Sequence, residues 1–464
     1  MTAEEEVMAL RAEVARLKEQ LAQALELTAK LQAELEHLRA SPPPAIKPNT
    51  PRPTNEDKTG NKARRKRAKE QNGARRREQT PTRTVQHRLE KCPDCGYGLR
   101  HTTLAHRRQV IELPPPPPVE VTEHQLFKSW CARCQKWHYA SVDLRGQVVG
   151  RGRMGVGIAS LVAYLRTALR LPIRQITEYL YTVHGLTISN GEIVELLHRV
   201  AQTEPVKKAV HSIKARVRAN SIVHGDETSW RQAGQNGYVW CFCTPQGERY
   251  YEYDRSRGGA VVKRILGTEF KGTLVTDFYA AYNDLPCEHQ RCWVHLLRDL
   301  HELKVAYLSN GEVVGWIEQV RKLYDKGKGL MQGPSPPSQQ RREIAYIELV
   351  HCAQELGLKY ANAKLHKEHP CHTLAKRLLL YIDELFQFVL TPGLSADNNL
   401  AERSVRPVVV MRKVSGGSQS GKGSTTRMTL NSLFGTWRAK GLNPFFQCLA
   451  LLSSQPVPSP TPLI

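Results

Sequence analysis

The chain has 464 residues, of which 40% are hydrophobic, and a formal net charge of +23. This length is enough for roughly two to four domains, with a sizeable core in at least one of them. So large a positive surplus favours nucleic acid as the partner over a role in solubility alone. The sequence has no signal peptide and no apolar run of about 18 residues, so we expect a bacterial cytoplasmic, nucleoid-associated protein, neither secreted nor inserted in a membrane.

Residues 1–40 are predicted to form a coiled coil of the leucine-zipper type. Apolar residues recur there in alternating steps of three and four, which is the spacing of a coiled-coil seam. They are Val7, Leu10, Val14, Leu17, Leu21, Ala24, Thr28, Leu31, Leu35 and Leu38. The alternative is one amphipathic helix packed on its own domain. Because a proline-rich break follows at Ser41, we favour self-association into at least a dimer.

Residues 41–90 are predicted to be a basic linker that is disordered on its own. From Arg52 to Lys91 there are 14 basic and five acidic side chains. Such a segment can lie along DNA, where each neutralised phosphate releases counterions; the alternative is a solvated spacer. The residues expected to contact DNA are Arg64, Arg65, Lys66, Arg67, Arg75, Arg76 and Arg77.

Residues 91–145 carry two Cys-x-x-Cys pairs, which predict a zinc ribbon. The pairs are Cys92 with Cys95 and Cys131 with Cys134. Four thiolates can close a tetrahedron around Zn²⁺, and a module this small needs the ion to hold it together. In a chain without a secretion signal, such pairs indicate metal ligands in place of disulfides. His138 lies near the second pair but is not needed to complete the site.

Residues 151–215 are predicted to be helical and to resemble a helix-turn-helix. The second helix begins near Pro172, and Ser189 with Glu192 forms a capping box that opens the third. An apolar face of the first helix includes Leu165 and Leu169. The region can read a major groove, although a helical connector without groove contacts has the same pattern.

Residues 216–300 are predicted to form the first part of an RNase H-like α/β core. Asp226 and Asp277 each end a short β-branched apolar run, and the order of three strands, a helix and a further strand is that of such a sheet. Alternation along the strand points Glu227 to the other face. Downstream, Cys292 and His295 share a helical face; they either support the active site or belong to the core.

An all-α insertion is predicted over residues 301–395, with helices at about 311–325, 339–360 and 372–390. Residues 396–450 then complete the core, with Glu402 in a segment that reads as a helix start. The chain after Glu402 is basic, and we expect Arg403, Arg406, Arg412 and Lys413 to contact DNA. The loop that begins at Ser415 can place backbone N–H groups on phosphates, but it lacks the P-loop order that binds ATP. Residues 451–464 are expected to be a disordered tail.

Four motifs together resemble the DDE transposases of insertion-sequence family sixty-six, of the TnpC type. They are Asp226-Glu-Thr, Thr276-Asp-Phe-Tyr-Ala-Ala-Tyr, Asp397-Asn-Asn-Leu-Ala-Glu-Arg-Ser-Val-Arg-Pro and Gly441-Leu-Asn-Pro. The resemblance implies that Asp226, Asp277 and Glu402 bind two Mg²⁺ ions, which Mn²⁺ can replace, and cut and join DNA at the element's terminal inverted repeats. At Val414-Ser-Gly-Gly-Ser this chain departs from the aromatic-rich stretch of the family, so the resemblance does not define the DNA contacts of this segment.

Two other functions fit part of the sequence. A stand-alone RNase H-like nuclease or resolvase would use the same three acidic residues, but it would not need a zipper, a zinc ribbon and a basic arm. A transposase-derived regulator would bind DNA without cutting it, yet the three acidic residues are all present. A transposase acting on element ends and target DNA, with or without helper proteins from the same element, therefore accounts for most of the chain.

Overall fold

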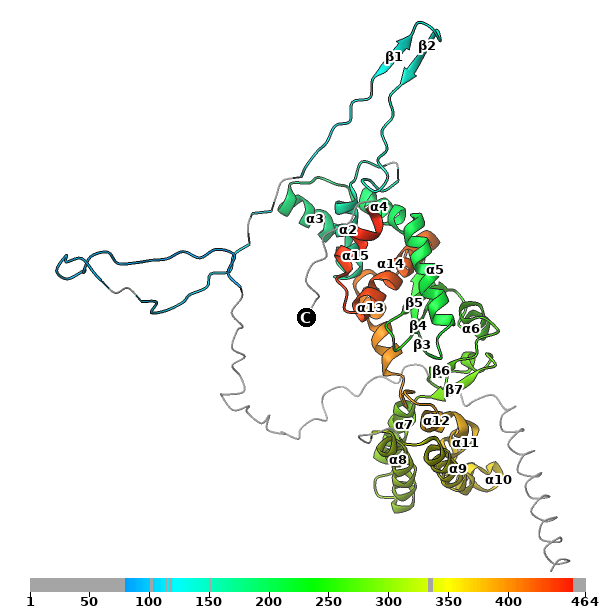
Figure 1. The fold of residues 1–464 in the computed structure, drawn as a ribbon. Helices are drawn as coiled ribbons and strands as arrows, with labels where there is room; N and C mark the ends of the chain where they lie inside the picture. The colour runs from blue at the N-terminus through cyan, green and yellow to red at the C-terminus, as the bar shows by residue number, and fades with distance from the viewer. Residues whose placement is uncertain are drawn as a thin grey trace, which may run out of the picture. The chain divides into compact units, whose positions relative to one another are not determined.

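The computed structural model describes residues 80–100, 103–113, 115–116, 119–150, 152–332 and 337–453 (Figure 1). The predicted coiled coil and the basic runs 64–67 and 75–77 lie outside these residues, as does the tail beyond 453. The chain divides into two compact units, Lys47–Glu120 and the remainder, and each is described by itself. No helix within the described residues is long and apolar enough to cross a membrane.

The centre of the larger unit is a mixed five-stranded sheet in the order β5-β4-β3-β6-β7. Strands β3, β4 and β5 are antiparallel neighbours, whereas β6 pairs in parallel with β3, and β7 pairs in parallel with β6. The bounds are Ile222–Gln232 (β3), Gln235–Cys243 (β4), Arg249–Asp254 (β5), Thr273–Thr276 (β6) and Glu288–Arg291 (β7). Helix α6 (Gly259–Leu266) connects β5 to β6, so the predicted order of three strands, a helix and a strand is confirmed.

Strand β3 is longer than its apolar run predicts. A strand ending at Asp226 was the expectation, but β3 continues to Gln232 and residues 227–232 pair with β4. The turn between the strands consists of Ala233 and Gly234, both with positive φ, the geometry whose twist matches a two-residue hairpin. Asp226 therefore lies inside a strand, where it pairs with Cys241 of β4.

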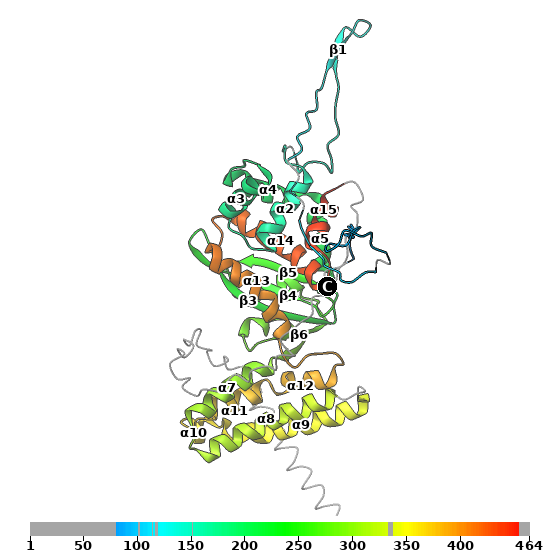
Figure 2. The same ribbon diagram turned by 90° about the vertical axis from the view of Figure 1, so that its left-hand side faces the viewer.

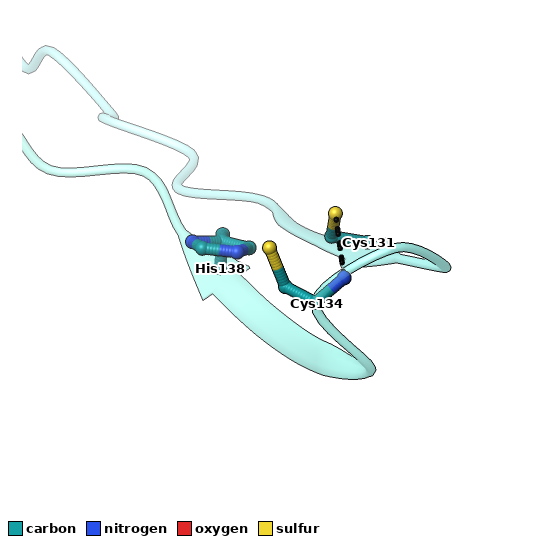
Figure 3. Close-up of side chains that lie close together, drawn as sticks. All are labelled: Cys131, Cys134 and His138. Carbon is teal, nitrogen blue, oxygen red and sulfur yellow. Dashed lines mark hydrogen bonds between the residues drawn. The ribbon is translucent and has the colours of Figure 1, made fainter.

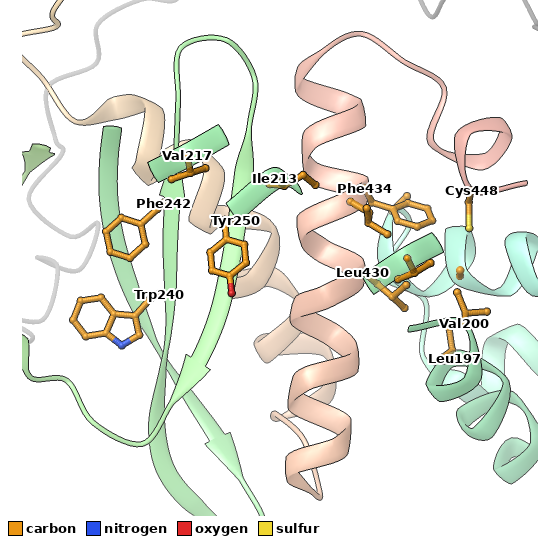
Figure 4. Packing of buried hydrophobic residues seen from close by; sticks show 14 of the residues in the cluster. Leu197, Val200, Ile213, Val217, Trp240, Phe242, Tyr250, Leu430, Phe434 and Cys448 are labelled. Carbon is orange, nitrogen blue, oxygen red and sulfur yellow. The ribbon is translucent and has the colours of Figure 1, made fainter. Parts of the chain in front are cut away.

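One hydrophobic core joins helices from distant parts of the sequence to the sheet (Figure 4). These helices are α2 (Val156–Thr167), α3 (Ile173–His184), α4 (Asn190–Gln202), α5 (Glu204–Arg218), α14 (Gly421–Ala439) and α15 (Pro444–Leu452). Val200 of α4 and Phe434 of α14 belong to the same buried cluster as Phe242 of β4. The helical region 151–215 is thus packed into one body with the sheet and the C-terminal helices. Because α15 reaches Leu452, the first two residues of the predicted tail are helical.

The predicted starts of two of these helices are confirmed. Pro172 directly precedes α3, which ends where Gly185 adopts φ 66°. The Ser189 side chain accepts a hydrogen bond from the backbone N–H of Glu192 at 3.1 Å and so caps α4. Leu169, expected on the apolar face of the first helix, lies beyond the end of α2 and is 44% exposed.

A group of helices between β7 and residue 391 packs around a second core, which also includes Ile222 of β3 and Val275 of β6. They are α7 (Trp293–Ala306), α8 (Gly311–Met331), α9 (Gln339–Ala361), α10 (Ala363–His366), α11 (His372–Leu380) and α12 (Ile382–Leu390). Trp293, Trp316 and Phe386 are buried together within them. Buried Gln290 of β7 accepts a hydrogen bond from the Phe388 backbone at 2.7 Å, which joins α12 to the edge of the sheet. Figure 2 shows these helices side by side.

Candidate active site

Asp226 and Asp277 stand at the same level on neighbouring parallel strands. The pairing of β3 with β6 places His224 opposite Val275. Two residues further on, the same register brings Asp226 level with Asp277, which directly follows the end of β6. Alternate residues of a strand share a face, and paired strands lie about 4.8 Å apart. The register therefore directs both carboxylates to one face.

Helix α13 (Asn399–Ser415) covers that same face of β3 (Figure 2). Trp230, four residues after Asp226 on the strand, is buried in a cluster with Val408 and Met411 of α13. Residues four apart on a strand point the same way. Glu402 lies in the first turn of α13, so the packing of this helix brings a third carboxylate to the two aspartates.

The three carboxylates interact electrostatically. Burial is the main reason that the pKa of Asp226 is raised well above its usual value, and the negative charges of Glu227, Asp277 and Glu402 raise it further. Oε1 of Glu402 is buried and has no hydrogen-bond partner among the described residues. Buried like charges are unfavourable unless a proton or a cation neutralises them. Because every donor is a carboxylate oxygen, the set fits Mg²⁺, which prefers oxygen ligands.

Glu227 lies on the opposite face, in a network that supports Asp277. Its carboxylate accepts hydrogen bonds from Nη2 of Arg257 at 2.7 Å and from the hydroxyl of Tyr282. The Arg257 guanidinium lies over the Tyr279 ring, 4.0 Å from its centroid. The Tyr279 backbone N–H donates to Oδ1 of Asp277 at 3.0 Å. Both oxygens of Glu227 are engaged here, which agrees with its exclusion as a metal ligand.

Cys292 and His295 lie next to Glu402. Cys292 precedes α7, and His295 is the third residue of that helix. One ligand atom from each of the three residues lies within 4.8 Å of the other two. Nε2 of His295 is 3.8 Å from Oε1 of Glu402. Burial raises the pKa of the Cys292 thiol to about 11. From the sequence, this pair either supports the active site or belongs to the core. The structure favours the first alternative, because it places the pair beside Glu402, a candidate site carboxylate.

Asn398, directly before α13, is a buried connection that the sequence analysis missed. Its Nδ2 donates to the Gly225 carbonyl at 2.8 Å, and its Oδ1 lies 3.1 Å from Nδ1 of His224. Its backbone N–H donates to Sγ of Cys292 at 3.2 Å, and the Cys292 N–H donates to the Thr276 carbonyl at 2.9 Å. Burial lowers the pKa of His224 to about 4, so the neutral ring can donate from Nδ1. Asn398 thereby fixes the start of α13 against both strands that carry the aspartates.

We expect Asn398→Ala to lower the free energy of unfolding by about 2–4 kcal/mol. The change leaves the Gly225 carbonyl and the His224 ring buried without their partner, at roughly 1–3 kcal/mol for each group. Urea unfolding followed by tryptophan fluorescence measures the effect. Asn399→Ala is the control, one residue along the chain, and should change stability by less than about 0.5 kcal/mol. Equal stability of the two variants would contradict the role given to Asn398.

The basic residues that follow Glu402 have two different environments. Arg403, Arg406 and Lys413 are exposed along α13. Arg412 turns toward the sheet, where its Nη1 donates to Oγ1 of Thr228 at 3.1 Å. Three of these four cations are therefore exposed and able to reach phosphates, while Arg412 holds α13 on β3.

The Gly/Ser-rich loop after α13 is bonded to the β3–β4 hairpin. The Ser418 N–H donates to the Arg231 carbonyl at 2.9 Å, and the Ala233 N–H donates to the Ser418 carbonyl at 2.8 Å. Gly417 has φ 130°, and a Cβ there would lie 2.1 Å from the Arg231 carbonyl oxygen, so glycine is required. The expectation that this loop offers its N–H groups to phosphates is wrong for Ser418, whose N–H is used within the protein.

The second cysteine pair lies in a hairpin with a histidine beside it (Figure 3). Strands β1 (Lys128–Cys131) and β2 (Lys136–Tyr139) pair in antiparallel fashion. Sγ of Cys131 accepts a hydrogen bond from the Cys134 N–H at 3.4 Å, and ligand atoms of Cys131, Cys134 and His138 lie within 4.8 Å of one another. Backbone N–H bonds lower the pKa of Cys131. The sequence analysis set His138 aside, yet the hairpin register brings it to both thiols.

The first cysteine pair belongs to the smaller unit, where it forms a similar turn. The Cys92 N–H donates to the Tyr97 carbonyl at 2.8 Å, and the Gly96 N–H donates to the Cys92 carbonyl at 2.9 Å. Backbone N–H bonds from Asp94 and Cys95 lower the pKa of the Cys92 thiol. Each pair thus has the local geometry that favours a thiolate ligand.

Comparisons with known proteins agree with the motif resemblance. A family model described as "Transposase IS66 family" matches residues 151–426, and one described as "zinc-finger binding domain of transposase IS66" matches residues 90–135. A relative from Sinorhizobium fredii, the uncharacterized protein y4qI, is 24% identical over 324 residues. That similarity covers 62% of this chain and 58% of the relative, so the chain spans little more than half of the relative's length.

Proposed function

The chain belongs to the IS66 family of transposases. We therefore propose that it cuts and joins DNA at the terminal inverted repeats of its own insertion sequence. One observation carries the proposal. Asp226, Asp277 and Glu402 come from three separate segments, and β3, β6 and α13 direct them to one face of the sheet. Carboxylates gathered in this way suit phosphoryl transfer with paired divalent cations.

We assign the core to the RNase H-like class. Three antiparallel strands followed by two parallel ones, in the order β5-β4-β3-β6-β7, support the assignment. The helices α7–α12 form the insertion between the second aspartate and the glutamate. The assignment explains why 124 residues can separate Asp277 from Glu402 in the sequence without separating their carboxylates, because the inserted helices pack around a core at the edge of the sheet.

Asp226 and Glu402 would hold one Mg²⁺, and Asp226 and Asp277 the other, with Mn²⁺ able to replace either. Bound there, such ions lower the pKa of an attacking water or 3′-hydroxyl and stabilise the departing 3′ oxygen. The protein's part is to hold the ligands still. Tyr279 fixes one oxygen of Asp277, and the bonds of Asn398 fix the helix that carries Glu402. Preset ligand positions avoid reorganisation during the reaction.

DNA would be bound by several parts of the chain. Exposed Arg403, Arg406 and Lys413 on α13 begin next to Glu402 and can neutralise phosphates flanking the cut. Helices α3 and α4 are joined by a short turn and capped at Ser189, the arrangement of a helix-turn-helix that could read the element ends. The basic runs at 64–67 and 75–77 would add affinity that does not depend on sequence.

Cleavage and joining of end DNA test this function. Purified full-length protein is incubated with a duplex that carries the inverted repeat from the flanking DNA of the gene, with Mg²⁺ and a supercoiled target. A transposase cuts at the repeat and joins that end to the target. A nuclease or resolvase cuts but joins nothing, and a regulator binds the repeat without cutting, so either result would replace the proposed function. A reaction that needs an added protein from the same element would identify a helper.

For the ribbon, we propose that Cys92, Cys95, Cys131 and Cys134 bind one structural Zn²⁺. The zinc-finger match over residues 90–135 supports this set, because it includes all four cysteines and ends before His138. Four thiolates complete a structural tetrahedral site. The competing set would replace a cysteine by His138, which lies near Cys131 and Cys134.

Removing one thiolate should release the zinc. Binding of structural zinc contributes about 10–16 kcal/mol in small zinc modules, so Cys92→Ser or Cys131→Ser should lose the ion and unfold the ribbon while the catalytic core stays folded. Zinc per chain is measured by mass spectrometry. His138→Ala should keep the zinc, as should Cys352→Ser, a control thiol on α9. Freshly purified protein without zinc would refute the ribbon, and loss of zinc in His138→Ala would change its ligand set.

A further inference from the structure

Three different metal-binding atoms meet where α7 and α13 begin. Cys292 and His295 stand three residues apart at the start of α7, and Glu402 lies in the first turn of α13. Sγ, a ring nitrogen and a carboxylate oxygen from these residues lie within 4.8 Å of one another. The spacing at a helix start puts the thiol and the imidazole on the same side. The three donor atoms are therefore close enough together to share one ion.

The histidine and the glutamate do not satisfy each other. Nε2 of His295 and Oε1 of Glu402 are 3.8 Å apart, too far for a hydrogen bond. Nδ1 of His295 and Oε1 of Glu402 are both buried without a hydrogen-bond partner among the described residues. The two side chains are nonetheless 28% and 36% exposed, so a small ion can reach them from solvent. A buried carboxylate oxygen without a partner is rare, and a cation bound between it and Nε2 of His295 would supply one.

The sulfur is already placed as a metal ligand would be. Sγ of Cys292 accepts a hydrogen bond from the Asn398 N–H at 3.2 Å. The same kind of bond, from Cys134 N–H to Sγ of Cys131 at 3.4 Å, occurs in the zinc ribbon hairpin. This N–H donor holds the sulfur in place close to His295 and Glu402. Cys292 therefore has the same N–H contact as Cys131 without belonging to either Cys-x-x-Cys pair.

We propose that Cys292, His295 and Glu402 bind a Zn²⁺-class cation, and that this ion inhibits strand cleavage because it withholds Glu402 from the Mg²⁺ ligands. Thiolate, imidazole and carboxylate are the ligands that Zn²⁺ takes, with a fourth position left open, whereas Mg²⁺ selects oxygen. Binding forms a zinc–sulfur bond and releases the thiol proton to solvent. The inhibition rests on the proposed function, but the metal site does not.

Zinc stoichiometry tests the site directly. Full-length protein is dialysed against buffers in which a chelator fixes the free zinc concentration, and bound zinc per chain is measured by mass spectrometry. Cys292→Ser should hold one zinc fewer than the unaltered chain at saturation, since serine keeps an acceptor for the Asn398 N–H but loses the thiolate. Cys352→Ser, which removes a thiol on α9, should match the unaltered chain. Equal zinc in Cys292→Ser and the unaltered chain at every concentration would overturn the site.

A second variant covers the case in which Cys292→Ser does not fold. His295→Gln leaves the thiol and its bond from Asn398 in place, and it should show the same loss of one zinc. Co²⁺ gives an independent readout, because a thiolate–cobalt charge-transfer band should be weaker in Cys292→Ser than in Cys352→Ser after the ribbon has been filled with zinc. Bands of equal strength would contradict the involvement of the Cys292 sulfur.

The inhibitory role is tested with end DNA in Mg²⁺, each variant being compared with its own rate without added zinc. Cleavage by the unaltered chain and by Cys352→Ser should be lost as the second zinc binds, and cleavage by His295→Gln should lose much less. Cleavage that persists with the second zinc bound would overturn the inhibition. If no protein cleaves under any condition, the proposed function is rejected, while the zinc count still decides whether the site exists.

Discussion

Asp226→Asn, Asp277→Asn and Glu402→Gln should each abolish cleavage of end DNA while binding of that DNA stays nearly unchanged. Each change removes one carboxylate from the proposed metal ligands and keeps the size of the side chain. Loss of a ligand misplaces the attacking and departing oxygens, an effect of several kcal/mol that corresponds to a rate loss on the order of a thousandfold or more. Cleavage is followed on labelled DNA, and binding by gel shift.

A matched control comes from the segment after the second aspartate. Asp284 is exposed and lies outside the carboxylate group, so Asp284→Asn should cleave at the rate of the unaltered protein. Near-normal cleavage by any one of the three site variants would remove that residue from the site. Loss of both cleavage and binding would instead indicate a folding defect, which the urea unfolding transition would reveal.

Local sequence patterns were enough to locate the elements that carry the three acidic residues. Val275, before Asp277, and Val223, before Asp226, belong to apolar runs that predict strands, and Asp397-Asn-Asn indicates a helix start before Glu402. Strand alternation also placed Glu227 on the opposite face, where Arg257 engages it. Such features depend on neighbours a few residues away, which is why periodicity and capping residues reveal them.

Features that depend on distant segments were missed or misread. Asn398 bonds to Gly225, 173 residues earlier in the chain, and no local pattern encodes that contact. The glycines of the loop after α13 predict a flexible segment that could bind phosphates. In the structure Ser418 of this loop bonds to the β3–β4 hairpin, a contact that the glycines do not indicate. The pair Asn398-Asn399 at the helix start was the one available signal, because a helix needs only one such side chain as its cap.

The same distinction applies to domain boundaries. A helical region at 151–215 and a C-terminal core segment at 396–450 appear separate in sequence because their apolar patterns are local. In the structure, Val200 and Phe434 share one buried cluster. We infer that α3 and α4 cannot swing freely from the sheet to reach DNA, so the spacing between any groove contact and the cut is fixed by this core. Under the proposed function, that rigidity would keep a constant distance between a groove contact made by α3 or α4 and the site of cleavage.

Replacing Leu17 and Leu31 with Lys should leave binding to a single DNA end intact and abolish joining to target. Both leucines occupy the predicted coiled-coil seam, in the segment outside the described residues. Lysines there would bury like charges across the seam and favour monomers. Transposition must act on two ends together, so a chain that cannot dimerise should form no paired-end complex. Light scattering measures the dimer, and gel shift separates single-end from paired-end complexes.

Ala12→Lys with Ala33→Lys is the matched control for this double variant. It adds the same two charges at outer positions of the same predicted coiled coil, so the dimer and the joining reaction should persist. If both double variants lose joining, added charge and not the seam is responsible. If the Leu17 and Leu31 variant still forms a normal paired-end complex, assembly must reside in the catalytic core or in helices α7–α12, whose exposed Ile344 and Ile347 on α9 would then be the first surface to alter.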